Sequence, residues 1–174
     1  MILIIDMSSN PLSRWEFVEP IRKIVKDAGF DCRIEHYTKI NATSIVKYDR
    51  IILCGTAIAD NEFLRHDFSW LRATKKPVFG VCAGMEVIAK TFGGSIVDTD
   101  EIGMIEIDTD DKLLGKGKVS AYGLHGKGVS LPEGFTETAS NGSGVQGMKK
   151  DNIYAIQFHP EVRNEKILEK WLKN

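Results

Sequence analysis

Short uninterrupted apolar runs constrain the fold of this chain more than any other feature. They occupy residues 2–5, 51–54 and 77–81. Strands read in this way when both of their faces are buried, as happens when helices cover a parallel sheet on both sides. The first and third runs are followed by segments, residues 15–25 and 84–92, whose apolar side chains recur near a 3.6-residue period, which predicts helices. Strands alternating with helices predict a doubly wound α/β fold, in which sites lie at the carboxyl ends of parallel strands.

The rest of the chain adds strands to this framework. Residues 32–37 alternate like a further strand, and residues 63–71 favour a short helix. Residues 95–156 consist of short alternating stretches, such as 104–107 and 119–122, separated by turns rich in aspartate and glycine. Residues 162–172 close the chain as an amphipathic helix. We therefore expect an α/β fold with a mostly parallel central sheet flanked by helices and with antiparallel additions in the C-terminal half.

Length and charge limit the classes of protein to consider. The chain has 174 residues and no repeat or linker that would divide it, so residues 1–174 are expected to form a single domain. With 43% apolar residues and 23 basic against 24 acidic side chains, the composition is typical of a soluble globular protein. A formal net charge of -1 provides no general positive field for nucleic acid or anionic lipid. No stretch approaches the 18 or so apolar residues of a membrane span, and the N-terminal run lacks the features of a signal peptide.

The cysteines and histidines predict neither a disulfide framework nor a metal site. Cys32, Cys54 and Cys82 are odd in number and contain no C-x-x-C pair. The four histidines show no paired ligand spacing. A reducing cytoplasm is the expected location.

Cys82 lies at a strand-to-helix junction between two glycines. Residues 80–84 read Gly-Val-Cys-Ala-Gly and join the predicted strand to the predicted helix, which is the backbone arrangement of a nucleophile elbow, with glycines that permit a sharp turn. Free N–H groups and the positive end of the dipole at a helix start favour a thiolate and can hold an oxyanion. Since most free cysteines are small buried hydrophobes, this motif alone leaves both interpretations open.

A second motif offers the groups that a nucleophilic cysteine requires. Residues 156–161 read Ile-Gln-Phe-His-Pro-Glu and precede the last predicted helix. His159 can take and return a proton, and Glu161 can fix the tautomer of the imidazole. Alone, the pair reads as a loop histidine and a solvated glutamate, but together with Cys82 it favours a Cys-His-Glu triad.

With both motifs the chain resembles the class I glutamine amidotransferases. The family pattern Gly-aliphatic-Cys-x-Gly matches residues 80–84, and aliphatic-Gln-Phe-His-Pro-Glu matches residues 156–161. Softer similarities, at residues 125–126, 131–135 and 148–149, are most like the separate glutaminase subunit of GMP synthase. The resemblance implies that Cys82 attacks the side-chain amide of glutamine, that ammonia leaves, and that water releases glutamate from a thioester. It also implies oxyanion and substrate contacts at Gly55, Thr56, Ala83, Gly84, Glu86, Leu124, His125 and Gly126.

The same resemblance implies a division of labour between chains. Ammonia would pass to an ATP-pyrophosphatase-type synthetase subunit that converts XMP to GMP, with ATP and Mg on that partner and no cofactor or metal on this chain. Consistent with this, no phosphate-binding loop is present, since residues 115–118 lack the G-x-x-x-x-G-K-S/T frame. Neither nucleic acid nor a membrane is an expected partner.

Three positions depart from the family pattern. The usual Gly-Gly-Pro loop reads Cys54-Gly55-Thr56, and a threonine would be strained there if the loop needed a positive φ. The usual glutamine four residues after the nucleophile is Glu86, which only accepts hydrogen bonds when ionised. The usual aspartate of Ser-His-Gly-Asp is Lys127, which changes the local charge by two units where a synthetase would dock. His125, in the same segment, is expected to be a loop residue rather than a second base.

These departures keep two alternatives open. One is a stand-alone amidase or γ-glutamyl hydrolase, in which Thr56, Glu86 and Lys127 accommodate a different amide. The other is a non-catalytic regulatory subunit that keeps the fold, against which the intact triad weighs.

Overall fold

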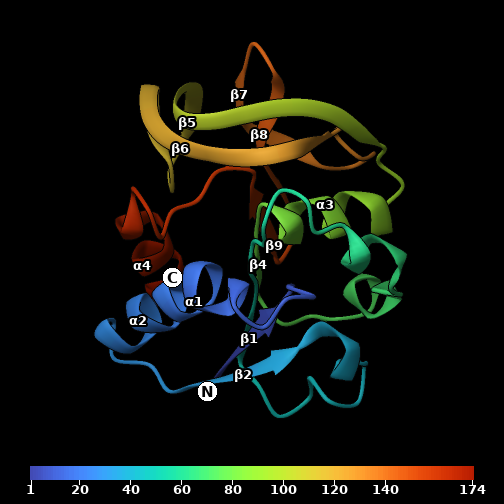
Figure 1. Ribbon diagram of the computed structural model, residues 1–174. Coiled ribbons are helices and arrows are strands. Elements are labelled where there is room, and N and C mark those ends of the chain that lie inside the picture. Colours follow the sequence, from blue (N-terminus) through green and yellow to red (C-terminus); the bar gives the residue numbers. More distant parts are fainter.

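A nine-stranded sheet runs through the molecule in the computed structural model, which describes residues 1–174, and helices lie on both of its faces (Figure 1). The strands follow the spatial order β2-β1-β3-β4-β9-β8-β7-β5-β6. Their bounds are β1 (Ile2–Asp6), β2 (Cys32–His36), β3 (Arg50–Leu53), β4 (Val78–Val81), β5 (Ile96–Asp111), β6 (Gly115–Val129), β7 (Thr136–Asn141), β8 (Gly144–Lys150) and β9 (Ile153–Ile156). The helices are α1 (Ser13–Phe17), α2 (Glu19–Asp27), α3 (Ala83–Thr91) and α4 (Glu165–Lys173), with 3-10 turns η1 (Tyr37–Lys39), η2 (Glu62–Arg65) and η3 (Ser69–Arg72).

The sheet has a parallel half and an antiparallel half. β2, β1, β3, β4 and β9 pair in parallel, whereas β8, β7, β5 and β6 continue the sheet with antiparallel pairs. This confirms the predicted fold class. β9 comes from the end of the chain yet pairs with β4, and the register sets Ile156 opposite Val81. The carboxyl ends of these two strands therefore lie side by side.

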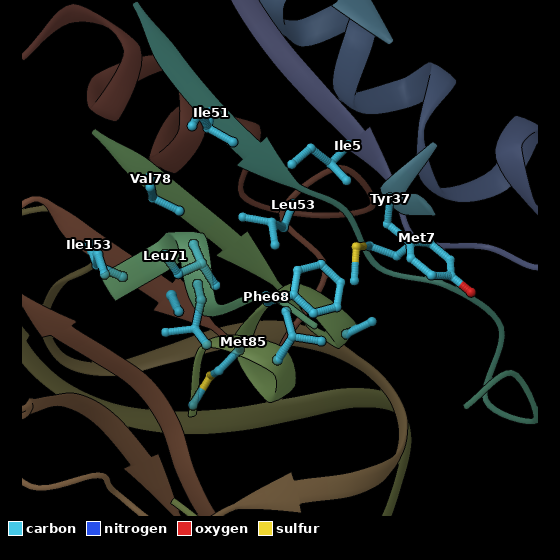
Figure 2. Close-up of a cluster of buried hydrophobic side chains, with 14 of the residues drawn as sticks. Ile5, Met7, Tyr37, Ile51, Leu53, Phe68, Leu71, Val78, Met85 and Ile153 are labelled. Atoms are coloured by element: carbon cyan, nitrogen blue, oxygen red, sulfur yellow. The ribbon is translucent and has the colours of Figure 1, made fainter. Parts of the chain in front are cut away.

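The parallel strands are buried on both faces. Along β1, Leu3 and Ile5 face the core beneath α3, while Ile2 and Ile4 face the core beneath α2 and α4. Figure 2 shows the first of these cores, where Ile5, Leu53 and Val78 project from neighbouring strands. Each fully buried side chain of this size contributes about 1.5–3 kcal/mol. The continuous apolar runs in the sequence are therefore explained by burial of these strands on both faces of the sheet.

Two predicted helices are broken in the structure. The segment at residues 15–25 divides at Val18 into α1 and α2, with Pro20 in the first turn of α2, where its missing N–H is tolerated. Trp15 is 70% exposed and does not pack on the sheet, although the helical pattern of apolar residues over 15–25 includes it. The predicted helix at residues 63–71 is instead the pair of 3-10 turns η2 and η3.

The antiparallel strands are longer than their sequence pattern indicated. β5 and β6 have 16 and 15 residues and form one curved hairpin across the end of the sheet (Figure 1). The sequence pattern predicted turns at the aspartate-rich and glycine-rich stretches within these strands. In the structure these stretches are paired between β5 and β6. Lys118 lies 2.6 Å from Glu106 across the hairpin, and Lys116 lies 3.7 Å from Asp110. Opposite charges on facing strands therefore replace the apolar alternation that normally identifies a strand.

No helix in the structure has the length and apolar character needed to cross a membrane.

Candidate active site

The predicted site residues follow three neighbouring strands. Gly55 comes shortly after β3, Cys82 directly after β4, and His159 shortly after β9. The carboxyl ends of parallel strands meet at one edge of the sheet, which is where sites form in this architecture. Pairing of β4 with β9 thus brings together two motifs that are far apart in the sequence. The N–H of Cys82 donates to the carbonyl of Ile156 over 2.9 Å, which fixes the start of one motif against the other.

Cys82 has the strained backbone of a nucleophile elbow. Its φ of 47° and ψ of -106° lie outside the regions that side-chain-bearing residues favour, at a cost of about 1–3 kcal/mol. The flanking glycines have no positive φ, so they do not supply the turn that the sequence suggested. Gly84 supplies space instead, because a Cβ there would lie 2.5 Å from the carbonyl oxygen of Leu53. The absence of a side chain lets the start of α3 approach the end of β3.

His159 and Glu161 form a buried pair. The His159 Nδ1 and Glu161 Oε1 atoms are 2.8 Å apart, and both side chains are 1% exposed. Burial alone lowers the pKa of His159, but attraction to the Cys82 and Glu161 charges outweighs it and raises that pKa well above its ordinary value. With Nδ1 directed at Glu161, Nε2 is left without a hydrogen-bond partner. The pair therefore presents an imidazole nitrogen that is free to exchange a proton.

The Cys82 thiol is directed toward the wall of the site. Its Sγ lies 3.7 Å from the carbonyl oxygen of Leu124 and 3.9 Å from the side-chain nitrogen of Gln157, and no hydrogen bond joins it to His159. Burial raises the pKa of the thiol, and the nearby His159 opposes this rise. The helix start alone therefore does not produce the thiolate that the sequence suggested. Ionisation depends on transfer of the proton to His159, a contact that often forms only when substrate binds.

The loop after β3 is unstrained despite its unusual sequence. Neither Gly55 nor Thr56 has a positive φ, so the strain considered for threonine does not arise. Their backbone N–H groups make no hydrogen bond within the protein. The Thr56 hydroxyl donates to Asp60 over 3.1 Å, and the Ser9 N–H donates to the same carboxylate over 2.6 Å. A Cβ at position 55 would lie 2.6 Å from Cε1 of His159, so glycine is required there for space.

A narrow cleft collects most of the predicted substrate contacts. The other predicted site residues do not line this cleft. Gly84 packs against Leu53 of β3, and Gly55 and Glu161 contact the His159 ring. Larger hollows elsewhere, such as the one beside α4, contain none of the predicted residues. The cleft is lined by Thr56, Ala57, Ile58, Asp60, Asn61, Phe63, Cys82, Ala83, Glu86, Leu124, His125, Gly126 and Lys127.

His125 is a buried strand residue rather than a loop residue. It lies on β6, is 2% exposed, and its Nε2 atom is 3.0 Å from Oε2 of Glu101 on β5. Glu101 also accepts from Asn141 over 2.7 Å and from Gln146 over 2.6 Å. Burial lowers the pKa of His125 although Glu101 opposes the change. This network supports the cleft wall from four strands, and its members are too scattered in the sequence for any local pattern to indicate it.

Two further residues that had no assigned role lie at the site. Gln157 is fully buried, and its side-chain nitrogen lies between Cys82 and Glu86, 3.5 Å from Oε1 of the latter. The only signal for it was its place in the second motif. Phe17 packs its ring 5.4 Å from the His159 ring, measured between centroids. Its position depends on the break between α1 and α2, which the sequence pattern did not reveal.

Comparisons with known proteins agree with this arrangement. The family model described as glutamine amidotransferase class-I matches residues 14–174. A glutamine-hydrolyzing GMP synthase subunit from Methanosarcina barkeri is 31% identical over 170 residues, which cover 91% of this chain and 89% of that protein.

A longer relative and a solved structure extend the comparison. A glutamine-hydrolyzing GMP synthase from Brachyspira hyodysenteriae is 36% identical over 191 residues, and the match covers 99% of this chain but 36% of that protein. A crystal structure assigned to a GMP synthase subunit of Thermoplasma acidophilum has a TM-score of 0.84 and 24% identity, covering 99% of this chain and 92% of the other. This last likeness concerns the fold.

Proposed function

The chain belongs to the class I glutamine amidotransferase family, and from this premise we propose that it is the glutaminase subunit of a two-chain GMP synthase, releasing ammonia from glutamine through a thioester on Cys82. The family assignment supports a glutamine-hydrolysing enzyme. The observation that carries the proposed mechanism is the meeting of a strained Cys82 with a buried His159–Glu161 pair at the ends of β4 and β9.

In the first half-reaction, His159 takes the proton of Cys82 and the sulfur attacks the side-chain carbonyl carbon of glutamine. The carbon becomes tetrahedral, and negative charge gathers on its oxygen. The N–H of Ala83, the first residue of α3, has no carbonyl partner within the helix, and the N–H groups of Gly55 and Thr56 are also free. A donor of this kind is typically worth about 3–4 kcal/mol of transition-state stabilisation.

Collapse of this intermediate breaks the carbon–nitrogen bond. His159 donates its proton to the departing nitrogen, ammonia leaves, and the acyl group remains on Cys82 as a thioester. In the second half-reaction, His159 takes a proton from water, whose oxygen attacks the thioester. The carbon–sulfur bond then breaks, glutamate leaves, and the sulfur regains its proton. Glu161 holds the imidazole and stabilises its charged form throughout.

The acceptor of the ammonia is proposed from the relatives. The Methanosarcina protein is named as a glutamine-hydrolyzing subunit of GMP synthase, and the match covers nearly its whole length. We therefore expect the partner to be an ATP-pyrophosphatase-type synthetase subunit that uses ATP and Mg to convert XMP to GMP.

Glutamine hydrolysis by the purified chain, alone and with such a synthetase subunit, ATP, Mg and XMP, tests this function. Strong stimulation of ammonia release together with GMP formation is the expected result. Hydrolysis of another γ-glutamyl amide without a partner, with glutamine left intact, would instead assign a stand-alone amidase. No turnover of any amide, with or without the partner, would indicate a non-catalytic subunit.

Replacing Glu161 by Gln should lower kcat by about 100- to 10,000-fold, because the imidazole loses the charge that stabilises its protonated form and its correct tautomer. Loss of this negative charge also lowers the pKa of His159 from its raised value. Initial rates of ammonia release measure the effect. Glu165→Gln is the matched control, since Glu165 is an exposed residue of α4. An unchanged kcat in Glu161→Gln would remove Glu161 from the mechanism.

A further inference from the structure

Asp60 joins the loop after β3 to the loop after β1. Its Oδ2 atom accepts from the Thr56 hydroxyl over 3.1 Å and from the N–H of Ser9 over 2.6 Å. Its Oδ1 atom accepts a longer contact from the N–H of Glu62, at 3.4 Å. None of these donors is cationic, so these contacts are hydrogen bonds rather than ion pairs. Because β1 and β3 are parallel neighbours, this one side chain connects two loops at the edge of the sheet where the thiol lies.

The same residue also closes the loop after β3 upon itself. The Asp60 N–H donates to the carbonyl of Ala57 over 2.8 Å, which forms a turn over residues 57–60. The Asp60 carboxylate reaches one residue farther back, to the hydroxyl of Thr56. Thr56 is 3% exposed, and without this acceptor its hydroxyl would be buried and unsatisfied, which is unfavourable. One backbone and one side-chain hydrogen bond therefore hold residues 56–60 in a compact conformation.

The loop after β1 provides a fixed anchor for this connection. Asp6 ends β1 and is buried, and its carboxylate accepts from the N–H of Ser8 over 3.0 Å and from the Ser8 hydroxyl. The carbonyl oxygen of Ser8 lies 2.9 Å from Nε2 of His36, the last residue of β2. Ser9 follows directly and donates to Asp60. Hydrogen bonds therefore link the carboxyl ends of β2, β1 and β3 in succession.

The loop that Asp60 fixes carries N–H groups proposed to stabilise the oxyanion. The N–H groups of Gly55 and Thr56 make no hydrogen bond within the protein. A Cβ on Gly55 would lie 2.6 Å from Cε1 of His159 and 3.4 Å from Cβ of Cys82, so the backbone of this loop lies against both catalytic side chains. The family pattern has a proline in this loop, whose ring fixes φ, whereas residues 54–61 of this chain contain none. A loop without proline has more backbone freedom, so other contacts must fix its geometry.

We propose that Asp60 is a positioning residue for catalysis: by fixing Thr56 and the turn at residues 57–60 against Ser9, it holds the N–H groups of Gly55 and Thr56 toward the oxygen of the tetrahedral intermediate. This inference rests on the proposed function, because it assumes that an acyl oxygen gains charge beside Cys82. Asp60 acts through Thr56 and takes no part in making or breaking bonds. Its effect is largest in the transition state, because donors that are already in place stabilise charge as it develops.

Steady-state kinetics of the full-length chain with the synthetase subunit, ATP, Mg and XMP test the proposal. Asp60→Ala should lower kcat for ammonia release by about 100-fold, because displaced donors lose most of their effect on the transition state. KM should change by less than about 3-fold, since the oxygen of bound glutamine carries no full charge before attack.

Asp67→Ala is the matched control for this substitution. Asp67 also accepts from a loop N–H and a hydroxyl, both of Ser69, but it lies outside the cleft. Its removal should therefore leave kcat and KM unchanged. A kcat in Asp60→Ala no lower than that in Asp67→Ala would overturn the proposal.

Conservative variants distinguish hydrogen bonding from negative charge. Asp60→Asn keeps an oxygen that can accept from Thr56 and Ser9, so kcat should recover to within about 10-fold of the wild type. Thr56→Val removes the hydroxyl at nearly constant volume and should lower kcat by about 10-fold, and Thr56→Ser, which keeps the hydroxyl, should lower it less. A loss in Asp60→Asn equal to that in Asp60→Ala would assign the effect to negative charge and overturn the positioning role.

A double-mutant cycle tests the route through Thr56. If Asp60 acts through that hydroxyl, the double variant Asp60→Ala with Thr56→Val should be no slower than Asp60→Ala alone, since both substitutions remove the same contact. Losses that multiply in the double variant would show that the two side chains act independently, which would overturn the proposed route.

Glutamine binding separates positioning from a general disruption of the cleft. No oxyanion forms in the Cys82→Ala background, so adding Asp60→Ala should leave the dissociation constant of glutamine, measured by calorimetry, within about 3-fold. A loss of affinity as large as the loss in kcat would assign a merely structural role to Asp60. If urea unfolding shows that Asp60→Ala does not fold, Thr56→Val decides the question by the same two measurements, and an unchanged kcat in that variant would overturn the proposal.

The proposed function and this inference fail in different ways. If the wild-type chain hydrolyses glutamine but Asp60→Ala and Thr56→Val retain its kcat, only the role of Asp60 is overturned. If the wild-type chain hydrolyses no glutamine, with or without its partner, the proposed function is overturned and this inference with it.

Discussion

Cys82→Ala should abolish ammonia release from glutamine, with a fall in kcat of at least about 10,000-fold. The substitution removes the sulfur atom proposed to form the thioester, and neighbouring water lacks the preorganised approach that the elbow at the start of α3 provides. Ammonia release by the variant, alone and with the synthetase subunit, measures the loss. Retained turnover would rule out the proposed mechanism.

Cys32→Ala is the control for this experiment. Cys32 lies on β2, at the far edge of the parallel half of the sheet, and is partly exposed. An electrophilic glutamine analogue should label the wild-type protein and Cys32→Ala equally, and Cys82→Ala should remain unlabelled. Mass spectrometry of the labelled peptides locates the modification. Labelling at Cys54, which is fully buried directly after the adjacent strand β3, would place the nucleophile elsewhere.

Gly84→Ala should destabilise the fold by about 2–3 kcal/mol and lower kcat/KM by about 100-fold. The new Cβ would lie 2.5 Å from the Leu53 carbonyl oxygen and 2.8 Å from its Cβ. Because the closest opposing atom belongs to the backbone of β3, rotation of a side chain cannot relieve the contact, and α3 must move. That movement displaces Cys82 and the Ala83 N–H together. Urea unfolding and initial rates of hydrolysis measure the two effects.

Gly142→Ala separates the effect of this contact from a general effect of glycine replacement. A Cβ at position 142 meets no atom within 4 Å, and its φ is not positive. The free energy of unfolding should therefore change by no more than about 0.5 kcal/mol. Equal changes in the two variants would contradict the role assigned to the close approach of α3 and β3.

Local sequence patterns were sufficient to predict the strands that carry the site residues. The runs before Gly55, Cys82 and Gln157 are buried on both faces, and such strands need no partner to be recognised because nearly every residue in them is apolar. The same reasoning failed for β5 and β6. Their solvent faces carry paired charges and glycines, so the alternation is lost although the hydrogen-bonded ladder continues.

Helix patterns were less reliable where the backbone changes direction. Apolar residues near Trp15 recur at helical spacing, yet the break at Val18 turns Trp15 to solvent and directs Phe17 onto the His159 ring. The spacing of apolar residues predicts that a segment is helical. It does not predict how two short helices are oriented relative to the sheet.

The sequence by itself determined the fold class, the family and the identity of the groups proposed for catalysis, because these depend on patterns within a few consecutive residues. Burial on two faces, a cysteine between glycines and the Gln-Phe-His-Pro-Glu run are all of this kind. Only the tertiary structure decided which groups meet. The pairing of β4 with β9 brings His159 to Cys82, and the packing of β6 over α3 buries Glu86 opposite Lys127. Contacts between such distant residues depend on the order of the strands in the sheet and on the burial contributed by many segments. No pattern of a few consecutive residues determines either of these.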